Sequence, residues 1–129
     1  MIEKVILDYL TGYFADRQED VIVLMEAPQV PSDDFPVFPD NLVLIERLGG
    51  SKSNKLSHAS IALQSYGATL YDAVQRDAEV RFAMENAPAE VTALGRVALN
   101  SCYNFTDTRT GRYRYQSIYE IYYMEEALL

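Results

Sequence analysis

Two long segments of the chain alternate between apolar and polar side chains with the two-residue period of a β-strand. In residues 55–67, Ala59, Ile61 and Leu63 fall on one side of such a strand. In residues 112–126, Tyr, Ser and Ile occupy every second position from Tyr113 onward. Both segments therefore predict strands with one more apolar face, which needs cover from another layer of structure.

Two other segments have the spacing of an amphipathic helix. Residues 2–14 predict a helix that ends near Gly12, and residues 68–88 predict a longer helix that ends before Pro88. The side chains expected on the buried stripe of the longer helix are Leu70, Ala73, Val74, Ala78, Arg81 and Phe82. Those expected on its polar side are Asp72, Gln75, Arg76, Asp77 and Glu79.

Shorter strand patterns occur in residues 20–28, 41–50 and 91–105. Residues 29–40 contain three prolines and predict an extended loop, and residues 106–111 have the composition of a turn. The resulting order is α-β-β-β-α-β-β with two hairpins. We therefore expect a single α+β domain over residues 1–129, an antiparallel β-sheet packed against two main helices on one side.

A glycine-rich stretch lies between two expected strands and consists of Gly49, Gly50, Ser51, Lys52, Ser53, Asn54 and Lys55. A phosphate-binding P-loop requires a glycine, four further residues and then Gly-Lys-Ser/Thr, followed by a helix. Here the glycines are adjacent and the next segment alternates as a strand, so no helix N-terminus faces an anion. The spacing of a dinucleotide-binding fingerprint is absent too. We therefore predict a flexible, polar hairpin loop that orders against a partner.

Residues that support catalysis or metal binding are few. His58 is the only histidine, so a nucleophile paired with histidine has to use it, and a site with several histidine ligands is excluded. The adjacent acids Asp33 and Asp34 lie in the proline-rich segment, where their side chains point apart, and Glu125 and Glu126 have the character of a solvated tail. We expect no catalytic residue, no metal ion and no cofactor.

Cysteine content and hydropathy bear on the cellular compartment. The single cysteine, Cys102, excludes an internal disulfide and lies in an apolar strand-like segment, where we expect it to be packed. No apolar run approaches the roughly 20 residues of a membrane span, and the N-terminal residues lack a charged-then-apolar leader. We expect a protein of the reducing cytoplasm without a membrane partner.

The chain is acidic, with a net charge of −8 and a sequence pI of about 4.5. This balance disfavours bulk electrostatic binding of DNA, and the Arg-Tyr-Arg-Tyr run of residues 112–115 turns its arginines and tyrosines to opposite faces, unlike an RNA-binding sheet. Residues 1–40 contain nine acidic and two basic side chains, whereas residues 96–114 contain four arginines and one aspartate. Two such regions either pair head to tail between copies of the chain or are simply solvated.

The order of these motifs resembles the tail terminator, or tail completion, proteins of long-tailed bacteriophages. The resemblance runs from about Ile2 to Tyr123, and its most specific part is the pair "ERLGG" before the hairpin and "NFTDTRTGRYRYQ" near the end. The other motifs that carry it are "EAP" (26–28), "VLIERLGG" (43–50), "ASIALQSYG" (59–67) and "ATLYDAVQRDAEV" (68–80).

The resemblance implies an α+β structural protein of the virion without catalytic residues. It implies a homo-oligomeric ring, with six copies expected, that is assembled in the host cytoplasm on the head-proximal end of the tail. The ring would stop growth of the tail tube, bind the tail tube protein and the head connector or stopper protein, and let DNA pass without specific binding. Residues 49–55 match the loop that extends toward the ring lumen or a neighbour, and Arg109 and Arg112 fall on the other hairpin.

Three alternatives remain open at the level of sequence. The first is a head-tail connector or stopper subunit of the same virion. The second is a small ligand-binding or enzymatic α+β domain that uses His58 with a nearby acid, and a His58→Ala variant would lose activity only under this alternative. The third is an adaptor or antitoxin-like protein, which would bind a basic partner protein.

Overall fold

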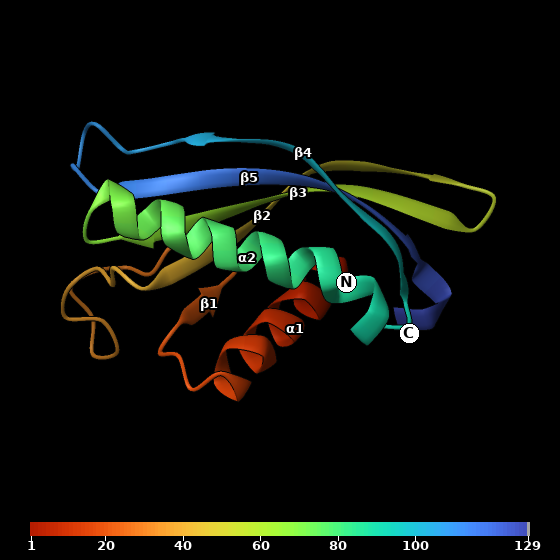
Figure 1. The fold of residues 1–129 in the computed structure, drawn as a ribbon, viewed down its shortest axis with the longest axis horizontal. Helices are drawn as coiled ribbons and strands as arrows, with labels where there is room; N and C mark the ends of the chain where they lie inside the picture. The colour runs from red at the N-terminus through yellow and green to blue at the C-terminus, as the bar shows by residue number, and fades with distance from the viewer. Residues whose placement is uncertain (129) are drawn as a thin grey trace.

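The computed structural model of the protein describes residues 1–128 and has an α+β architecture (Figure 1). Two helices lie on one side of a five-stranded sheet with the strand order β1-β2-β3-β5-β4. The elements in chain order are α1 (Ile2–Asp16), β1 (Ile22–Leu24), β2 (Leu42–Ser53), β3 (Leu56–Gly67), α2 (Leu70–Glu90), β4 (Leu94–Asn104), β5 (Tyr113–Met124) and a short 3₁₀ helix η1 (Glu125–Leu128). The predicted order α-β-β-β-α-β-β is confirmed.

The sheet is mostly antiparallel, as expected, with one parallel exception at its edge. β3 and β5 form its centre and pair along their whole length, from Leu56 with Met124 to Gly67 with Tyr113. β2 and β4 flank this pair as the other strands of the two hairpins. β1 is only three residues long, shorter than the strand expected over residues 20–28, and runs parallel to the start of β2.

The alternating segments bury the faces that their patterns predict. Ile61 of β3 and Ile121 of β5 are fully buried beneath the helices. Each large aliphatic side chain removed from water in this way stabilises the fold by about 1.5–3 kcal/mol. The helices complete this core with Ile2, Ile6, Leu10 and Phe14 from α1 and Val80, Ala83, Met84 and Ala87 from α2.

Both helices are longer than predicted. α1 continues through Gly12 to Asp16, because burial of Phe14 outweighs the roughly 1 kcal/mol that an exposed glycine costs inside a helix. α2 continues through Pro88 to Glu90. Pro88 lies in the last turn, where the loss of its N–H removes a single hydrogen bond, and the N–H of Val91 closes the helix on the carbonyl of Ala87.

The buried stripe of α2 also differs from the prediction. Leu70 and Phe82, which were expected to be buried, are 37% and 56% exposed, whereas Asp77, expected on the polar side, is fully buried. Ser117 of β5 donates a hydrogen bond to Asp77. The side chains that face the sheet are Ala73, Asp77, Val80, Ala83, Met84 and Ala87. Small alanines let the helix approach the sheet closely, and a partner on a distant strand makes burial of the aspartate possible.

β4 pairs irregularly with β5, with register shifts between Leu94 and Arg96 and between Leu99 and Ser101. A bulge between Leu99 and Ser101 turns Leu99 to the helix side with Tyr119, whereas Ser101 pairs with Ile118 on the open side. Cys102 is half-buried on this strand. The proline-rich segment is confirmed as a loop without regular structure, and its Val30–Pro31 peptide bond is cis.

No helix within residues 1–128 is long and apolar enough to cross a membrane.

Candidate interaction surfaces

The β2–β3 hairpin projects from the molecule and leaves part of its backbone uncovered. β1 pairs only with Leu42–Leu44, so within residues 1–128 β2 has no neighbouring strand on its outer side from Ile45 onward. All side chains of β2 from Glu46 to Ser53 are exposed. Figure 1 shows this hairpin extending beyond the ends of both helices. The outer edge of β2 therefore offers unpaired backbone donors and acceptors to a partner.

The hairpin turn is much shorter than predicted. Gly49–Ser53, expected to be part of a flexible loop, belong to β2 and pair with β3 as far as Ser53 with Leu56. Only Asn54 and Lys55 lie in the turn, with φ values of 50° and 71°. Positive φ at both central residues is the geometry of a tight two-residue hairpin turn, which asparagine tolerates well.

The two glycines have different structural roles. A bulge lies between Arg47 and Gly49, so the strand is locally distorted at this point. A Cβ atom at Gly50 would collide with the carbonyl oxygen of His58 on β3 and with the Arg47 guanidinium, whereas a Cβ atom at Gly49 would meet open space. Gly50 thus permits the close approach of β2 to β3, and both glycines belong to a paired strand instead of a loop.

Arg109 and Arg112 lie on the compact turn between β4 and β5. The Asp107 carboxylate accepts a hydrogen bond of 3.0 Å from the backbone N–H of Arg109, which lowers its pKa. The N–H of Gly111, at φ 74°, donates to the Asp107 carbonyl at 2.7 Å. These bonds hold the turn in one shape, and the Arg109 side chain is exposed at its tip.

Next to this turn, aromatic and arginine side chains alternate over the open face of the sheet. The Arg112 guanidinium lies 4.0 Å from the ring centroid of Phe38, and that of Arg114 lies 4.4 Å from the centroid of Phe105. Arg114 also donates to the Tyr66 hydroxyl at 3.2 Å. Because Phe38 comes from the proline-rich loop, this aromatic–arginine row fixes the loop to the sheet. The Arg112 side chain therefore packs against the Phe38 ring, whereas the Arg109 side chain is exposed.

The structure separates the two groups of residues that the sequence analysis singled out. Asn54 and Lys55 follow the end of β2 beside Leu56, and Arg112 precedes β5 beside Gly67. Because β3 joins these two ends over 12 residues, the groups lie about 36 Å apart along the strand direction. They form two distinct surfaces at opposite ends of one molecule.

A polar cluster surrounds His58 on the open face, and its acid, Glu120, was not identified from the sequence. Glu120 Oε1 lies 2.6 Å from both His58 Nε2 and Ser60 Oγ, and Asn100 donates to Oε2 at 2.9 Å. These hydrogen bonds lower the pKa of Glu120, with that from Asn100 contributing most. Because Ser60 and His58 bond to the same carboxylate oxygen, the three groups do not form a serine–histidine–acid relay. Only the register of β3 against β5 brings them together, and the sequence pattern does not encode that register.

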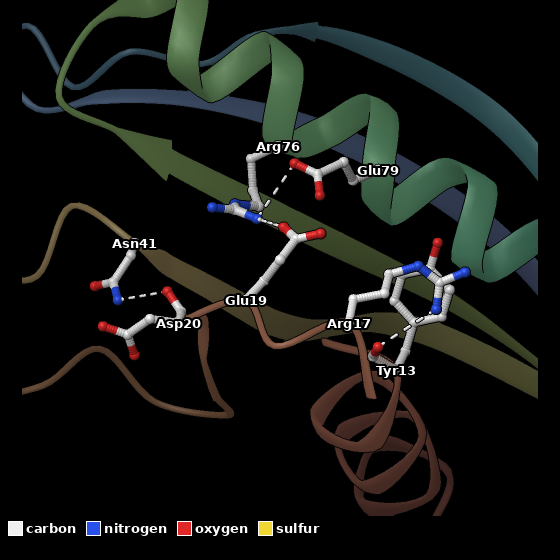
Figure 2. A network of polar contacts seen from close by, with 7 residues as sticks. All are labelled: Tyr13, Arg17, Glu19, Asp20, Asn41, Arg76 and Glu79. Carbon is white, nitrogen blue, oxygen red and sulfur yellow. Dashed lines mark hydrogen bonds and ion pairs between the residues drawn. The ribbon is translucent and has the colours of Figure 1, made fainter. Parts of the chain in front are cut away.

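A second polar network joins the segment after α1 to α2 (Figure 2). Arg76 Nη1 lies 2.8 Å from Glu19 Oε2 and 3.2 Å from Glu79 Oε1. Burial raises the pKa of Glu79 to about 7, and the neighbouring Glu19 carboxyl adds to this shift. Its hydrogen bond with Glu79 lowers the pKa of Glu19. Below neutral pH the two carboxyls therefore hold one proton between them.

A cleft of about 560 Å³ lies between α1 and the C-terminal half of α2. Tyr13 and Asp16 line its α1 side, and Phe82 and Glu90 line its α2 side. The Arg17 guanidinium stacks at 3.6 Å from the centroid of the Tyr13 ring (Figure 2). The cleft thus combines carboxylates with aromatic rings, and the Phe82 ring is left uncovered.

In the part of the chain that the structure describes, charged side chains without an ion-pair partner lie at the cleft, which Arg17 also lines, and at the β4–β5 turn. Within residues 1–128, neither Asp16 nor Glu90 forms an ion pair. The same holds for the four arginines between residues 96 and 114. Among these residues, acidic side chains without an ion-pair partner therefore lie at the cleft, and arginines without one lie on β4, on the β4–β5 turn and on β5.

Comparison with known proteins gives no assignment. No group of three or more His, Cys, Asp or Glu side chains in residues 1–128 is arranged to hold a metal ion. The two ends of the sheet and the helix cleft are the features on which a functional assignment depends. No known family model matches the chain, and no curated protein matches it.

Proposed function

We propose that this protein is a structural subunit that assembles head to tail into a ring, as a tail terminator of a long-tailed bacteriophage. The ring, with six copies expected, caps the tail tube, ends its polymerisation and provides the surface that joins the head connector. The single observation that carries this proposal is the projecting β2–β3 hairpin with its uncovered outer edge. The resemblance of the motifs from Ile2 to Tyr123 is the reason for proposing a tail terminator in particular.

A closed ring needs two different surfaces on each copy, because each subunit contacts one neighbour with one patch and the other neighbour with another. The chain offers distinct surfaces for such contacts: the β4–β5 turn with Arg109, the cleft between α1 and α2, and the hairpin tip at Asn54–Lys55. The surfaces differ in shape and chemistry, which favours a heterologous contact over a self-complementary dimer.

The charge of the chain supports passage of DNA through the ring. The net charge of −8 makes the protein as a whole repel the phosphates of DNA. A lumen lined by such a subunit lets the duplex slide without specific binding. The expected partners are copies of the chain itself, the tail tube protein and the head connector or stopper protein.

Electron microscopy of tails made with and without this protein in the producing cell tests the proposal. We expect cells that lack it to accumulate tails of uncontrolled length that are not joined to filled heads, and supply of the protein in trans to restore uniform tails. Uniform tails that fail only to join heads would identify a connector or stopper subunit instead. Normal, head-joined tails in its absence would overturn both assignments.

A further inference from the structure

We propose that the β4–β5 turn of one copy docks into the cleft between α1 and α2 of the next copy, with Arg109 as its central contact. This inference rests on the proposed ring and names the contact that holds neighbouring subunits together. The partner is a second copy of this chain, and the interaction pairs a guanidinium with carboxylates and an aromatic ring.

The cleft has the chemistry that recognises a guanidinium. Asp16 on α1 and Glu90 on α2 each contribute a carboxylate to the lining of the cleft, and the Phe82 side chain, which also lines it, is 56% exposed. An arginine can form charge-assisted hydrogen bonds to carboxylates while its flat face covers an aromatic ring. The cleft already holds one such contact, because Arg17 lies flat on Tyr13 on the α1 side. The Phe82 ring on the α2 side leaves room for a second.

The turn has the matching properties. Arg109 is exposed, forms no ion pair within residues 1–128 and sits at the tip of a turn fixed by Asp107. A turn that is already ordered loses little conformational freedom when it binds. Arginine and aromatic residues also contribute most of the binding energy in many protein interfaces.

The turn cannot reach the cleft of its own chain. Tyr113, which follows the turn, pairs with Gly67, just before the N-terminal end of α2. Phe82 and Glu90 lie in the C-terminal half of the same helix, so they are about 18 Å and 30 Å beyond its first residue. Figure 1 shows the turn and the C-terminal end of α2 at different ends of the molecule. The contact is therefore intermolecular and heterologous, as a ring requires.

Disulfide cross-linking between two variants tests this contact directly. Both carry Cys102→Ser; one carries Thr108→Cys on the turn, and the other carries Asn86→Cys in the cleft. We expect the mixture at low salt to form a cross-linked heterodimer under oxidation. Adding Arg109→Glu to the turn variant slows cross-linking about tenfold or more, since it places like charges together. Adding Asp16→Lys and Glu90→Lys to the cleft variant then restores the rate to within about threefold.

The matched control reverses two acids outside the cleft, Asp33→Lys and Asp34→Lys, in the cleft variant. If the contact is correct, these changes do not rescue Arg109→Glu. Absence of the cross-link, insensitivity to Arg109→Glu, or equal rescue by the control would each overturn the proposed contact. If rings cap tails but this cross-link does not form, the contact is wrong and the tail-terminator function stands. If the cross-link forms with the expected charge dependence but tails are normal in cells that lack the protein, the function is wrong and the contact stands.

Discussion

Among the acidic residues in the described part of the chain, Asp77 alone is fully buried. Ser117 donates a hydrogen bond to one carboxylate oxygen, and Arg81 Nε lies 3.1 Å from the other. Burial raises the pKa of Asp77, and these two partners oppose that shift. A buried carboxylate with such partners fixes how α2 sits against β5.

Removal of the Asp77 carboxylate is therefore expected to destabilise the fold. Asp77→Ala leaves Arg81 and Ser117 without their partner and should lower the free energy of unfolding by about 2–4 kcal/mol in urea titrations. Glu85→Ala on the exposed side of the same helix is the control and should change it by less than about 0.5 kcal/mol. Equal effects of the two changes would contradict the structural role of Asp77.

The Glu19–Glu79 pair predicts a pH dependence of stability. The folded-state pKa of Glu79 is raised from 4.5 to about 7, so the folded protein holds this proton more tightly than the unfolded chain. The resulting stabilisation is complete below about pH 4.5 and is lost as pH rises toward 7. The difference in free energy of unfolding between wild type and Glu79→Gln should therefore fall between pH 5 and 7 and stay constant above pH 8. A difference that is flat from pH 5 to 8 would show that Glu79 titrates normally.

At the scale of elements, the β2–β3 hairpin depends on one of its two glycines. Gly50→Ala places a methyl group against the His58 carbonyl and the Arg47 guanidinium, and should cost about 1–3 kcal/mol of stability. Gly49→Ala, one position away, meets open space and should change stability by less than about 0.5 kcal/mol. Urea unfolding with hydrogen exchange of the hairpin amides distinguishes the two. Similar losses for both variants would mean that the bulge is not shaped by this contact.

The sequence predicted both α-helices and all five strands but not their ends, and it did not predict the short 3₁₀ helix η1. A two-residue alternation identified β3 and β5 because each has one buried face. Glycine and proline suggested ends at Gly12, Gly50 and Pro88, yet each lies inside its element. Tertiary packing and strand pairing determine where these elements end, and local composition specifies neither of them.

At the scale of the whole molecule, sequence could show which surface residues are charged but not which of them meet. The chain places residues 49–55 and Arg109 at opposite ends of the sheet, because β3 and β5 run antiparallel over their full length. The same register joins His58 to Glu120, 62 residues away. The cleft at Phe82 was not predicted because periodicity placed Phe82 on the buried stripe of α2, whereas the helix buries a different stripe and leaves Phe82 exposed.

The β2–β3 hairpin is not a free arm, because β5 braces β3 as far as Leu56. The hairpin is the outer part of a three-stranded sheet that is anchored in the core. A force on its tip is therefore resisted by the hydrogen bonds between β3 and β5. In a ring, rigid hairpins of this kind would keep the diameter of the central channel constant. The position of the hairpin tip relative to the core would then be fixed when the chain folds and not when subunits assemble.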